Sequence, residues 1–384
     1  MPPAAAATAP LAYLDHAATT PLRPEAREAM LPWLGERFGN PSGGHALARA
    51  ARTAIEEARD VLADCLGARP GEVVFTGGGT EGDNLAIAGV HARRGGRVVC
   101  TAVEHHAVLH ACEALKGAVA AVDATGAVDL DALASLLGDD VSVVSVMLAN
   151  NEVGTVQPLG DVCALVADCS PAAVVHTDAV QGFPWLDVAG LAASAHLVAV
   201  SAHKFGGPQG VGALVVREGT AIEPLLRGGA QERDRRSGTH NVAGIAGMAA
   251  AARATVDQRA GTVARVATLR DRLADGLLAA VPGTTESGTR ATKVAGNCHL
   301  LFEGVESEAL LVLLDQAGVC ATAASSCASG AMDPSHVLAA MGVPRRLAAG
   351  SLRLSLGWSS TDADVDRALA VVPEAVDRLR RSSP

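Results

Sequence analysis

The sequence predicts an α/β protein in which a large domain with a mostly parallel sheet is followed by a smaller α+β domain. Over roughly the first 240 residues, short apolar runs alternate with longer amphipathic stretches. Strands that are apolar on both faces and separated by helices are typical of parallel sheets covered on both sides. Beyond that point the pattern changes to Ala-rich stretches followed by a few strands. With 384 residues, of which 49% are hydrophobic, the chain can bury a large core.

The strands expected in the first part are short and apolar. They lie at 72–75, 97–100, 141–148, 173–176, 197–200 and 213–216. Helical patterns lie between them, at 46–66, 106–115, 129–137 and 159–167. Because ligands of such sheets bind at the carboxyl ends of the strands, the residues that follow each strand are the first candidates for a site.

The second part begins with two Ala-rich helical stretches, at 245–259 and 262–280. A turn rich in Gly, Thr and Ser follows, then a strand at 298–302 and a helix at 308–317 that Ser307 is expected to cap. Another helix is expected from Asp333-Pro334 to near Gly342, and strict alternation over 351–356 predicts a half-buried strand. We expect the large domain to span 15–258 and the small domain to comprise 1–14 and 259–384.

Composition excludes several classes of function. The formal net charge is -10 and the basic residues are dispersed, which disfavours nucleic-acid binding because that needs a basic patch. No apolar run approaches the roughly 20 residues that span a bilayer, and the N-terminal MPPAAAATAP lacks the basic region of a signal peptide. The eight cysteines form no C-x-x-C pair, which favours a cytoplasmic protein with mostly buried free thiols.

Lys204 is the sharpest candidate for chemistry, and it is one of only three lysines among 31 basic residues. It follows the strand at 197–200 and precedes two glycines. Partial burial there would favour the uncharged amine, the form that makes a Schiff base. Ser201 and His203 beside it can donate hydrogen bonds to a phosphate. The alternative for an arbitrary lysine is a solvated position at a domain edge.

Asp178 and the turn at Gly79-Thr80 are two further features that would suit a cofactor with a pyridine ring and a phosphate group. Asp178 follows a buried strand, where a carboxylate is costly unless paired, and a pyridinium nitrogen is such a partner. A structural Asp that caps the next helix is the alternative. Gly79-Thr80 lie in the strand-to-helix turn TGGGTEGDN, the geometry that cradles a phosphate on helix N–H groups. The turn matches neither a Walker loop nor G-x-G-x-x-G, so a nucleotide is not favoured.

His105 follows the strand at 97–100, where it can stack over a planar cofactor or shuttle a proton. A metal site is the alternative, since His106 and His110 stand at i, i+4. That spacing predicts zinc poorly, and no third ligand presents itself, so we expect no metal.

Two other residues stand in settings that indicate function. Cys327 lies in a run of small residues (AASSCASG), and exposed loop thiols are the reactive ones. An incidental cysteine is the alternative. Arg353 stands among apolar residues in the alternating strand, where its bidentate guanidinium suits a substrate carboxylate. An intramolecular salt bridge is the alternative there.

Motifs over nearly the whole chain match one family. They are YLDHAATTP, FGNPSGGH, TEGDN, EHHAV, ANNEVG, HTDAVQ, SAHKFGGPQGVG, RRSGTHN, the Cys327 loop and RLSLG. With them the chain resembles the cysteine desulfurases, pyridoxal 5'-phosphate (PLP) enzymes of the class V aminotransferase group. The SAHK segment with Asp178 indicates the superfamily, and the Cys327 loop followed by PSHVLAAMG and RLSLG indicates the desulfurases. The resemblance implies the PLP-dependent transferase fold type I, with a seven-stranded-type sheet and a small domain that carries Cys327.

The resemblance also implies how the cofactor is bound. Lys204 would carry PLP and later move the Cα proton of the substrate. Asp178 would pair with the pyridinium nitrogen, Gln181 would hydrogen-bond the ring hydroxyl, and His105 would stack on the ring. The phosphate would be held by residues of two strand ends and by one residue of the partner subunit in a homodimer: Gly79, Thr80, Ser201, His203 and, from the partner, Thr239.

For the substrate, the resemblance implies that Asn151 and Arg353 bind the carboxylate and that Cys327 accepts the sulfur. Two motifs depart from the family: the phosphate turn reads GGGT, where a Ser and an Ala or Ser usually stand among the glycines, and the loop reads SSC rather than S-A-C. The chain ends soon after its expected last helix, at VDRLRRSSP, so the C-terminal extension by which some family members dock a scaffold is short or missing, and the partner stays open.

We therefore expect an L-cysteine desulfurase that yields L-alanine and a persulfide on Cys327 for a sulfur-acceptor protein. The alternative is a selenocysteine lyase or another PLP-dependent carbon–sulfur lyase. In such an enzyme Cys327 would be less important for the reaction of one substrate than for that of the other. A non-catalytic binding homologue is disfavoured, because a scaffold would not need Lys204, Asp178 and Cys327 together. The acceptor stays open among an iron–sulfur scaffold, a tRNA-thiolation carrier and a dedicated biosynthetic pathway.

Overall fold

The computed structural model describes residues 11–323 and 335–382. In this part of the chain seven strands form the central sheet, in the order β2-β8-β7-β6-β5-β3-β4. Their bounds are β2 Val73–Thr76, β3 Arg97–Thr101, β4 Ala118–Ala120, β5 Val141–Ser145, β6 Val174–Asp178, β7 Leu197–Ser201 and β8 Gly212–Val216. Strand β8 runs antiparallel to β2 and β7, and the other pairs are parallel. The predicted α/β fold with a mostly parallel sheet is therefore confirmed.

The sheet is buried on both faces because alternate residues of each strand enter different cores. In β7, Val198 and Val200 pack in one core, whereas Leu197 and Ala199 pack in the other. Helices α2 (Ala46–Cys65), α5 (Leu130–Leu136), α6 (Leu159–Cys169) and the first half of α8 (Val242–Ala280) cover the first face. Helices α3 (Gly79–Arg94) and α4 (His106–Ala114) cover the other. This double burial explains why the strands read as continuous apolar runs.

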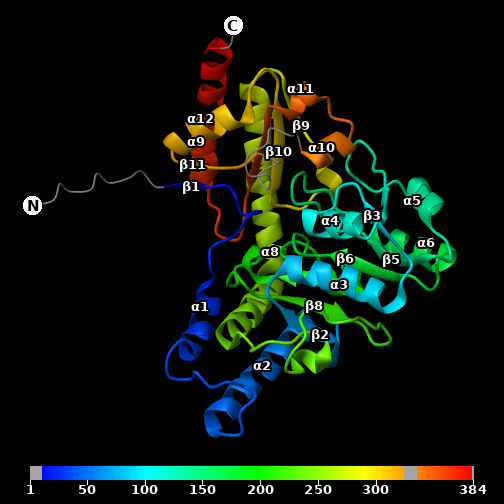
Figure 1. Ribbon diagram of the computed structural model, residues 1–384. Helices are drawn as coiled ribbons and strands as arrows, with labels where there is room; N and C mark the ends of the chain where they lie inside the picture. The colour runs from blue at the N-terminus through cyan, green and yellow to red at the C-terminus, as the bar shows by residue number, and fades with distance from the viewer. Residues whose placement is uncertain (1–10, 324–334, 383–384) are drawn as a thin grey trace, which may run out of the picture.

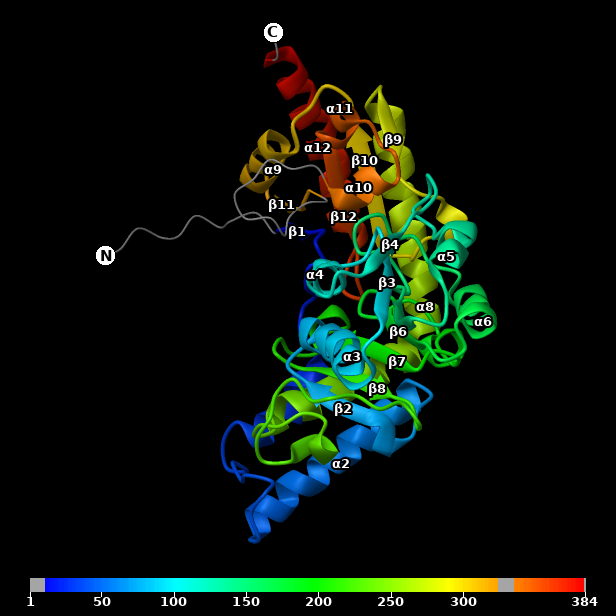
Figure 2. The same cartoon turned by 45° about the vertical axis from the view of Figure 1, so that its right-hand side comes forward.

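Helix α8 connects the two halves of the molecule. Figures 1 and 2 show it running from the central sheet into the half that holds the C-terminal helix. Its first half packs through Ile245 and Met248 in the sheet core, and its second half packs through Leu269 and Leu273 in a separate core. We expected two helices with a break near Gly261, and that was wrong: Gly261 lies within a 39-residue helix, which continues because both of its halves are packed in cores.

The second half contains two small sheets. The antiparallel sheet has the order β12-β10-β9, and β1 pairs with β11 in parallel. The bounds are β1 Ala12–Tyr13, β9 Thr284–Glu286, β10 Asn297–Phe302, β11 Val319–Cys320 and β12 Ser351–Ser355. The remaining helices are α1 Pro24–Met30, α7 Val188–Leu191, α9 Ser307–Gln316, α10 His336–Ala340, α11 Arg345–Ala348 and α12 Asp362–Ser382. The domain boundaries given above stay a prediction.

Four local expectations were wrong. Strand β12 is fully buried rather than half-buried, because its polar side chains are covered too: the Ser355 hydroxyl, for example, accepts from the Ala17 N–H. Strand β9 lies where a turn was expected, since it pairs with β10. The three-residue strand β4 was missed. Ser307 begins α9 rather than capping it, and its hydroxyl donates to two carbonyls of other segments.

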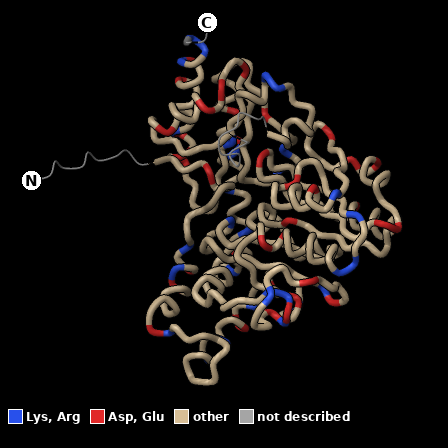
Figure 3. The backbone as a smooth tube through the Cα atoms, in the orientation of Figure 1, with Lys and Arg blue, Asp and Glu red and all other residues tan. Residues whose placement is uncertain are grey.

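Charge is spread over the molecule. Figure 3 shows acidic and basic residues interspersed along both halves of the tube. Among the described residues, no helix combines the length and the apolar character needed to cross a bilayer.

Candidate active site

The carboxyl ends of the parallel strands meet around one cavity of about 440 Å³. Strand β6 ends at Asp178, β7 ends at Ser201, and β2 leads into the start of α3. Strand β2 runs in the same direction as β7, because both are antiparallel to the β8 strand between them. Ten of the twelve residues singled out in the sequence line this cavity: Gly79, Thr80, His105, Asn151, Asp178, Gln181, Ser201, His203, Lys204 and Arg353.

Lys204 ends the short 3-10 turn Ala202–Lys204 that directly follows β7. Its ammonium nitrogen donates to the carbonyl oxygens of Ala17 and Ala18, at 2.6 and 2.8 Å. These carbonyls belong to the segment that follows β1, so residues far apart in the sequence hold the lysine in place. This segment is part of YLDHAATTP, which was noted only as part of the family resemblance.

Asp178 and His105 face the same cavity and influence each other's ionisation. Burial raises the pKa of Asp178, and the nearby His105 and Lys204 act in the opposite direction. Burial lowers the pKa of His105, which favours a neutral ring. The His105 Nδ1 accepts from the Ala107 N–H at 3.1 Å and caps α4, so its proton resides on Nε2. The site thus offers a buried carboxyl beside a neutral imidazole.

The start of α3 forms a turn whose backbone is suited to bind an anion. Its N-cap, Gly78, has φ 148°, and the first helical bond runs from the Gly82 N–H to the Gly78 carbonyl. The N–H groups of Gly79, Thr80 and Glu81 therefore have no backbone acceptor within the helix. A Cβ on Gly79 would lie 2.8 Å from Val180 Cγ2. A helix N-terminus with free N–H groups and no side chain in the way suits a phosphate. A second, open cavity of about 840 Å³ adjoins it and is lined by Gln209, Gly210, Leu225 and Leu226, among others.

Arg353, on β12, also lines this cavity. One guanidinium nitrogen pairs with Asp15 at 2.9 Å, and another donates to the Asn151 carbonyl at 3.0 Å. The salt bridge that was weighed as an alternative therefore exists. The Arg353 Nε is buried and has no hydrogen-bond partner among the described residues. The guanidinium keeps donor capacity for a further anion.

The remaining two predicted residues are Cys327 and Thr239. Cys327 lies outside the described residues. Thr239 is exposed and does not line the cavity of its own chain. Asp333 and Pro334 also lie outside the described residues, and the helix expected there, α10, is capped by Ser335.

Sequence reasoning missed Asp83, which also lines the cavity. It is 1% exposed, and burial together with Asp178 and Glu104 raises its pKa well above the usual value. Its Oδ1 lies 3.5 Å from His176 Nε2. The acidic residue was visible within TEGDN, but helical periodicity alone did not tell which of its polar residues faces the sheet.

The imidazoles of His106 and His110 have centroids 5.0 Å apart, and that of His336 lies 4.6 Å from His106. Within residues 11–323 and 335–382, no group of three or more His, Cys, Asp or Glu side chains is arranged to hold a metal ion.

Comparisons with known proteins agree with this fold and site. The class-V aminotransferase family model matches residues 12–368, and the chain belongs to that family. It is 47% identical to the IscS-like cysteine desulfurase of Mycobacterium tuberculosis, over 97% of this chain and 98% of that protein. It is 44% identical to the cysteine desulfurase IscS of Methanosarcina thermophila, over 97% and 93%. A solved NifS-like protein superposes with a TM-score of 0.90 at 34% identity, covering 96% of this chain and 100% of that one. The resemblance to cysteine desulfurases is therefore confirmed.

Proposed function

We propose that the chain is an L-cysteine desulfurase that binds PLP at Lys204 and transfers sulfur to Cys327. The observation that carries this proposal is the convergence of Lys204, Asp178 and the Gly79-Thr80 turn on one cavity. An amine, a buried carboxyl and an anion-binding helix end are the three groups that a phosphorylated pyridine aldehyde requires. They come from different strand ends, so chance proximity in sequence does not explain their grouping.

The residues present fit the cofactor. Lys204 would attach it covalently, and Asp178, whose burial calls for a positive partner, would hold the ring nitrogen. The Gln181 Oε1 is buried without a partner among the described residues and would accept from the ring hydroxyl. His105 would lie against the ring. The start of α3, with Ser201 and His203, would bind the phosphate.

The reaction follows from what each residue can do. The bound cofactor would act as an electron sink for the charge left when the substrate Cα proton departs. Arg353 and Asn151 would hold the substrate carboxylate and so fix the position of Cα. The Lys204 amine would take the Cα proton and return it to the substrate. The Cys327 thiolate would attack the substrate sulfur, so that an S–S bond forms as the Cβ–S bond breaks. Cβ would keep the electron pair and take up a proton equivalent to the one that the Cys327 thiol gave up, leaving a persulfide and alanine.

We propose further that the protein is a cytoplasmic homodimer that hands its sulfur to an acceptor protein. The open cavity beside the phosphate turn has exposed Leu225 and Leu226 on its wall, a surface that a second chain would cover. The exposed Thr239 would then reach the phosphate of the other subunit. The cytoplasmic location is supported by free thiols, most of them buried.

The test combines a covalent label with sulfur chemistry. Wild-type protein reduced with borohydride should carry PLP on Lys204, and Lys204→Ala should carry no reducible adduct. Cys327→Ser should keep PLP but release no sulfide from cysteine, whereas Cys320→Ser, a matched control on β11, should release it normally. An adduct retained by Lys204→Ala would refute the cofactor assignment. Normal sulfide release by Cys327→Ser would refute the acceptor role and favour a simple lyase.

A further inference from the structure

The backbone from Ala230 to Asp234 is in an unfavourable conformation. Ala230, Glu232, Arg233 and Asp234 have φ values of 63°, 50°, 56° and 64°. A side chain with a Cβ rarely adopts this left-handed region, and such residues persist only where their surroundings hold them. Four such residues within five positions require a strong local restraint.

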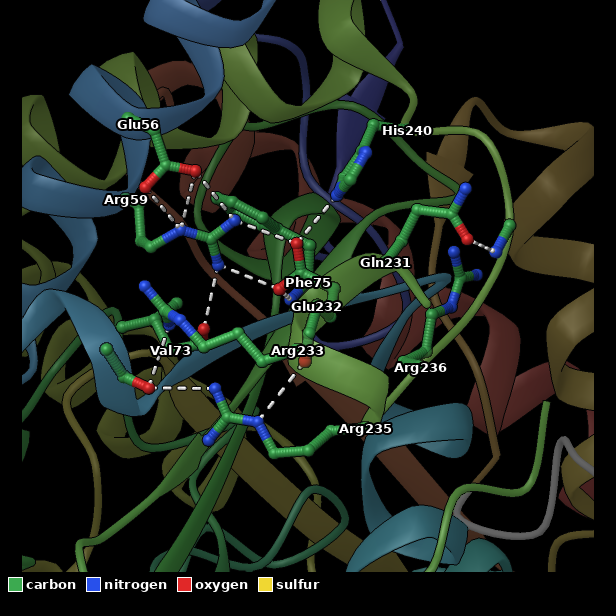
Figure 4. Close-up of polar contacts among 12 residues, drawn as sticks. Glu56, Arg59, Val73, Phe75, Gln231, Glu232, Arg233, Arg235, Arg236 and His240 are labelled. Carbon is green, nitrogen blue, oxygen red and sulfur yellow. Dashed lines mark hydrogen bonds and ion pairs between the residues drawn. The ribbon is translucent and has the colours of Figure 1, made fainter. Parts of the chain in front are cut away.

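The Glu232 carboxylate supplies this restraint (Figure 4). It is buried and forms a fork with Arg59 of α2, with N···O distances of 2.7 and 2.8 Å. It also accepts from the Phe75 N–H at 2.9 Å, and Arg59 donates to the Val73 carbonyl at 2.8 Å. Both partners are thus fastened to β2, the strand that leads into the phosphate turn.

The same carboxylate closes the segment from its other end. The His240 Nε2 donates to Glu232 at 2.7 Å, and the Gly238 N–H donates to the Gln231 side chain at 2.9 Å. The Arg59–Glu232 ion pair, here called the anchor, therefore fixes residue 232 and, through Glu232, residue 240. The exposed Thr239 directly precedes His240 in the chain. Thr239 is thereby presented to solvent from a rigid base.

A second contact joins the segment to the phosphate turn of its own chain. Arg236 forms an ion pair with Glu81 in the first turn of α3, at 2.7 Å, and Glu81 also accepts from the Gly77 N–H. An unneutralised carboxylate at this helix end would repel a phosphate, so Arg236 makes the turn more favourable for an anion.

A role in stability alone does not explain the Arg59–Glu232 pair. Replacing a buried ion pair by apolar residues is often neutral or stabilising, and the best attested benefit of such pairs is a unique conformation. A left-handed stretch needs that kind of restraint, because without it the chain would relax to ordinary φ values.

We propose that Arg59 and Glu232 are positioning residues that hold residues 230–240 rigid, so that Thr239 contacts the PLP phosphate of a second copy of this chain. This proposal rests on the homodimer and cofactor proposed above. It predicts that the anchor of one subunit controls cofactor retention in the other.

Mixed dimers made by co-expressing two differently tagged chains test this directly. In the first dimer, one chain carries Lys204→Ala and the other carries Glu232→Ala. PLP can then bind only to Lys204 of the Glu232→Ala chain, and the partner of that chain, which carries Lys204→Ala, has an intact anchor. In the second dimer, both substitutions are in one chain, and the lysine of the wild-type chain faces a released anchor. The readout is the borohydride-reducible adduct that remains at intervals after dilution.

The first dimer should keep PLP like a dimer of Lys204→Ala and wild-type chains. The second should lose it about ten- to a hundredfold faster, the range for one lost hydrogen bond to a charged group. Glu56→Gln in place of Glu232→Ala is the matched control: it removes the exposed partner of Arg59 and should leave retention unchanged. If Glu232→Ala does not fold by circular dichroism, Arg59→Lys, which keeps the charge but loses the fork, carries the same test.

Equal retention in the two mixed dimers, or faster loss in the first, would overturn the proposal, because the anchor would then act within its own chain or not at all. The wild-type protein separates this from failure of the proposed function. A wild-type protein without a reducible adduct, or one that holds PLP fully as a monomer, would refute the cofactor site or the dimer itself.

Discussion

The guanidinium of Arg353 lies 2.9 Å from the carboxylate of Asp15, so a strand near the C-terminus and the segment after β1 meet at the cavity. The same segment supplies the Ala17 and Ala18 carbonyls that hold Lys204. One stretch of chain therefore positions both Arg353, the proposed carboxylate-binding residue, and Lys204, the proposed cofactor lysine. Asp15 orients Arg353 but does not use all of its donors, since the buried Nε has no partner among the described residues.

Arg353→Lys should raise KM for cysteine about ten- to a hundredfold while PLP stays bound. A lysine keeps the charge but lacks the planar fork that holds a carboxylate with two hydrogen bonds. Steady-state kinetics and the visible spectrum measure the two effects. Arg272→Lys, at an exposed ion pair with Asp362, is the control and should behave as wild type. An unchanged KM in Arg353→Lys would argue that the residue serves only its salt bridge with Asp15.

Gly78→Ala should weaken PLP retention about tenfold or more, because Gly78 has φ 148°, a conformation that a residue with a Cβ rarely adopts, so the turn would have to change shape at the phosphate. Equilibrium dialysis against PLP measures the change. Gly160→Ala in α6 has nothing within 4 Å and should bind PLP normally without loss of stability. Unchanged dialysis curves for Gly78→Ala would show that the turn does not hold the phosphate.

Asp178→Asn should stabilise the cofactor-free protein while impairing catalysis. Burial raises the pKa of Asp178, so a neutral amide that keeps the Val180 contact relieves the cost of burying a charge. The loaded enzyme would lose the negative charge opposite the ring nitrogen, and kcat should fall about tenfold or more. Urea unfolding of the cofactor-free protein and turnover of the loaded protein are the two measurements. A variant that is less stable yet fully active would contradict both roles.

His299→Gln should reduce the loss of stability on acidification. The buried ring of His299 has its pKa lowered to about 3 by desolvation, so it stays neutral in the folded protein while the unfolded chain binds a proton below about pH 6.5. It therefore destabilises the fold as pH falls from about 6.5, by up to roughly 1.4 kcal/mol per pH unit. The pKa values of Glu104 and Glu152 are raised, to about 8 and about 7, so these two carboxyls make the folded protein more stable as pH falls. For this reason only the difference between the variant and the wild type is diagnostic. Denaturation curves from pH 6.5 to 5 that run parallel for the two proteins would refute the assignment.

The elements that the sequence predicted best are those whose signal is local. Strands β5, β6 and β7 lie close to the ranges expected, because apolar residues on both faces leave a continuous run. Where partners far away in the sequence decide the structure, the prediction failed. Strand β9 forms only because β10 is beside it, and α8 continues past Gly261 because both of its halves are packed in cores.

By itself, the sequence determined the fold class and the family and predicted the candidate site residues, because residue type and strand-end position are properties of the chain order. Only the tertiary structure decided that ten of these residues share one cavity, that Asp83 joins them and that Arg353 is shared with Asp15. It also decided the left-handed turn at Glu232, which no local pattern predicts. The physical reason is that burial, hydrogen-bond partners and backbone strain depend on residues brought together from distant segments, and Arg59 and Glu232 stand 173 positions apart.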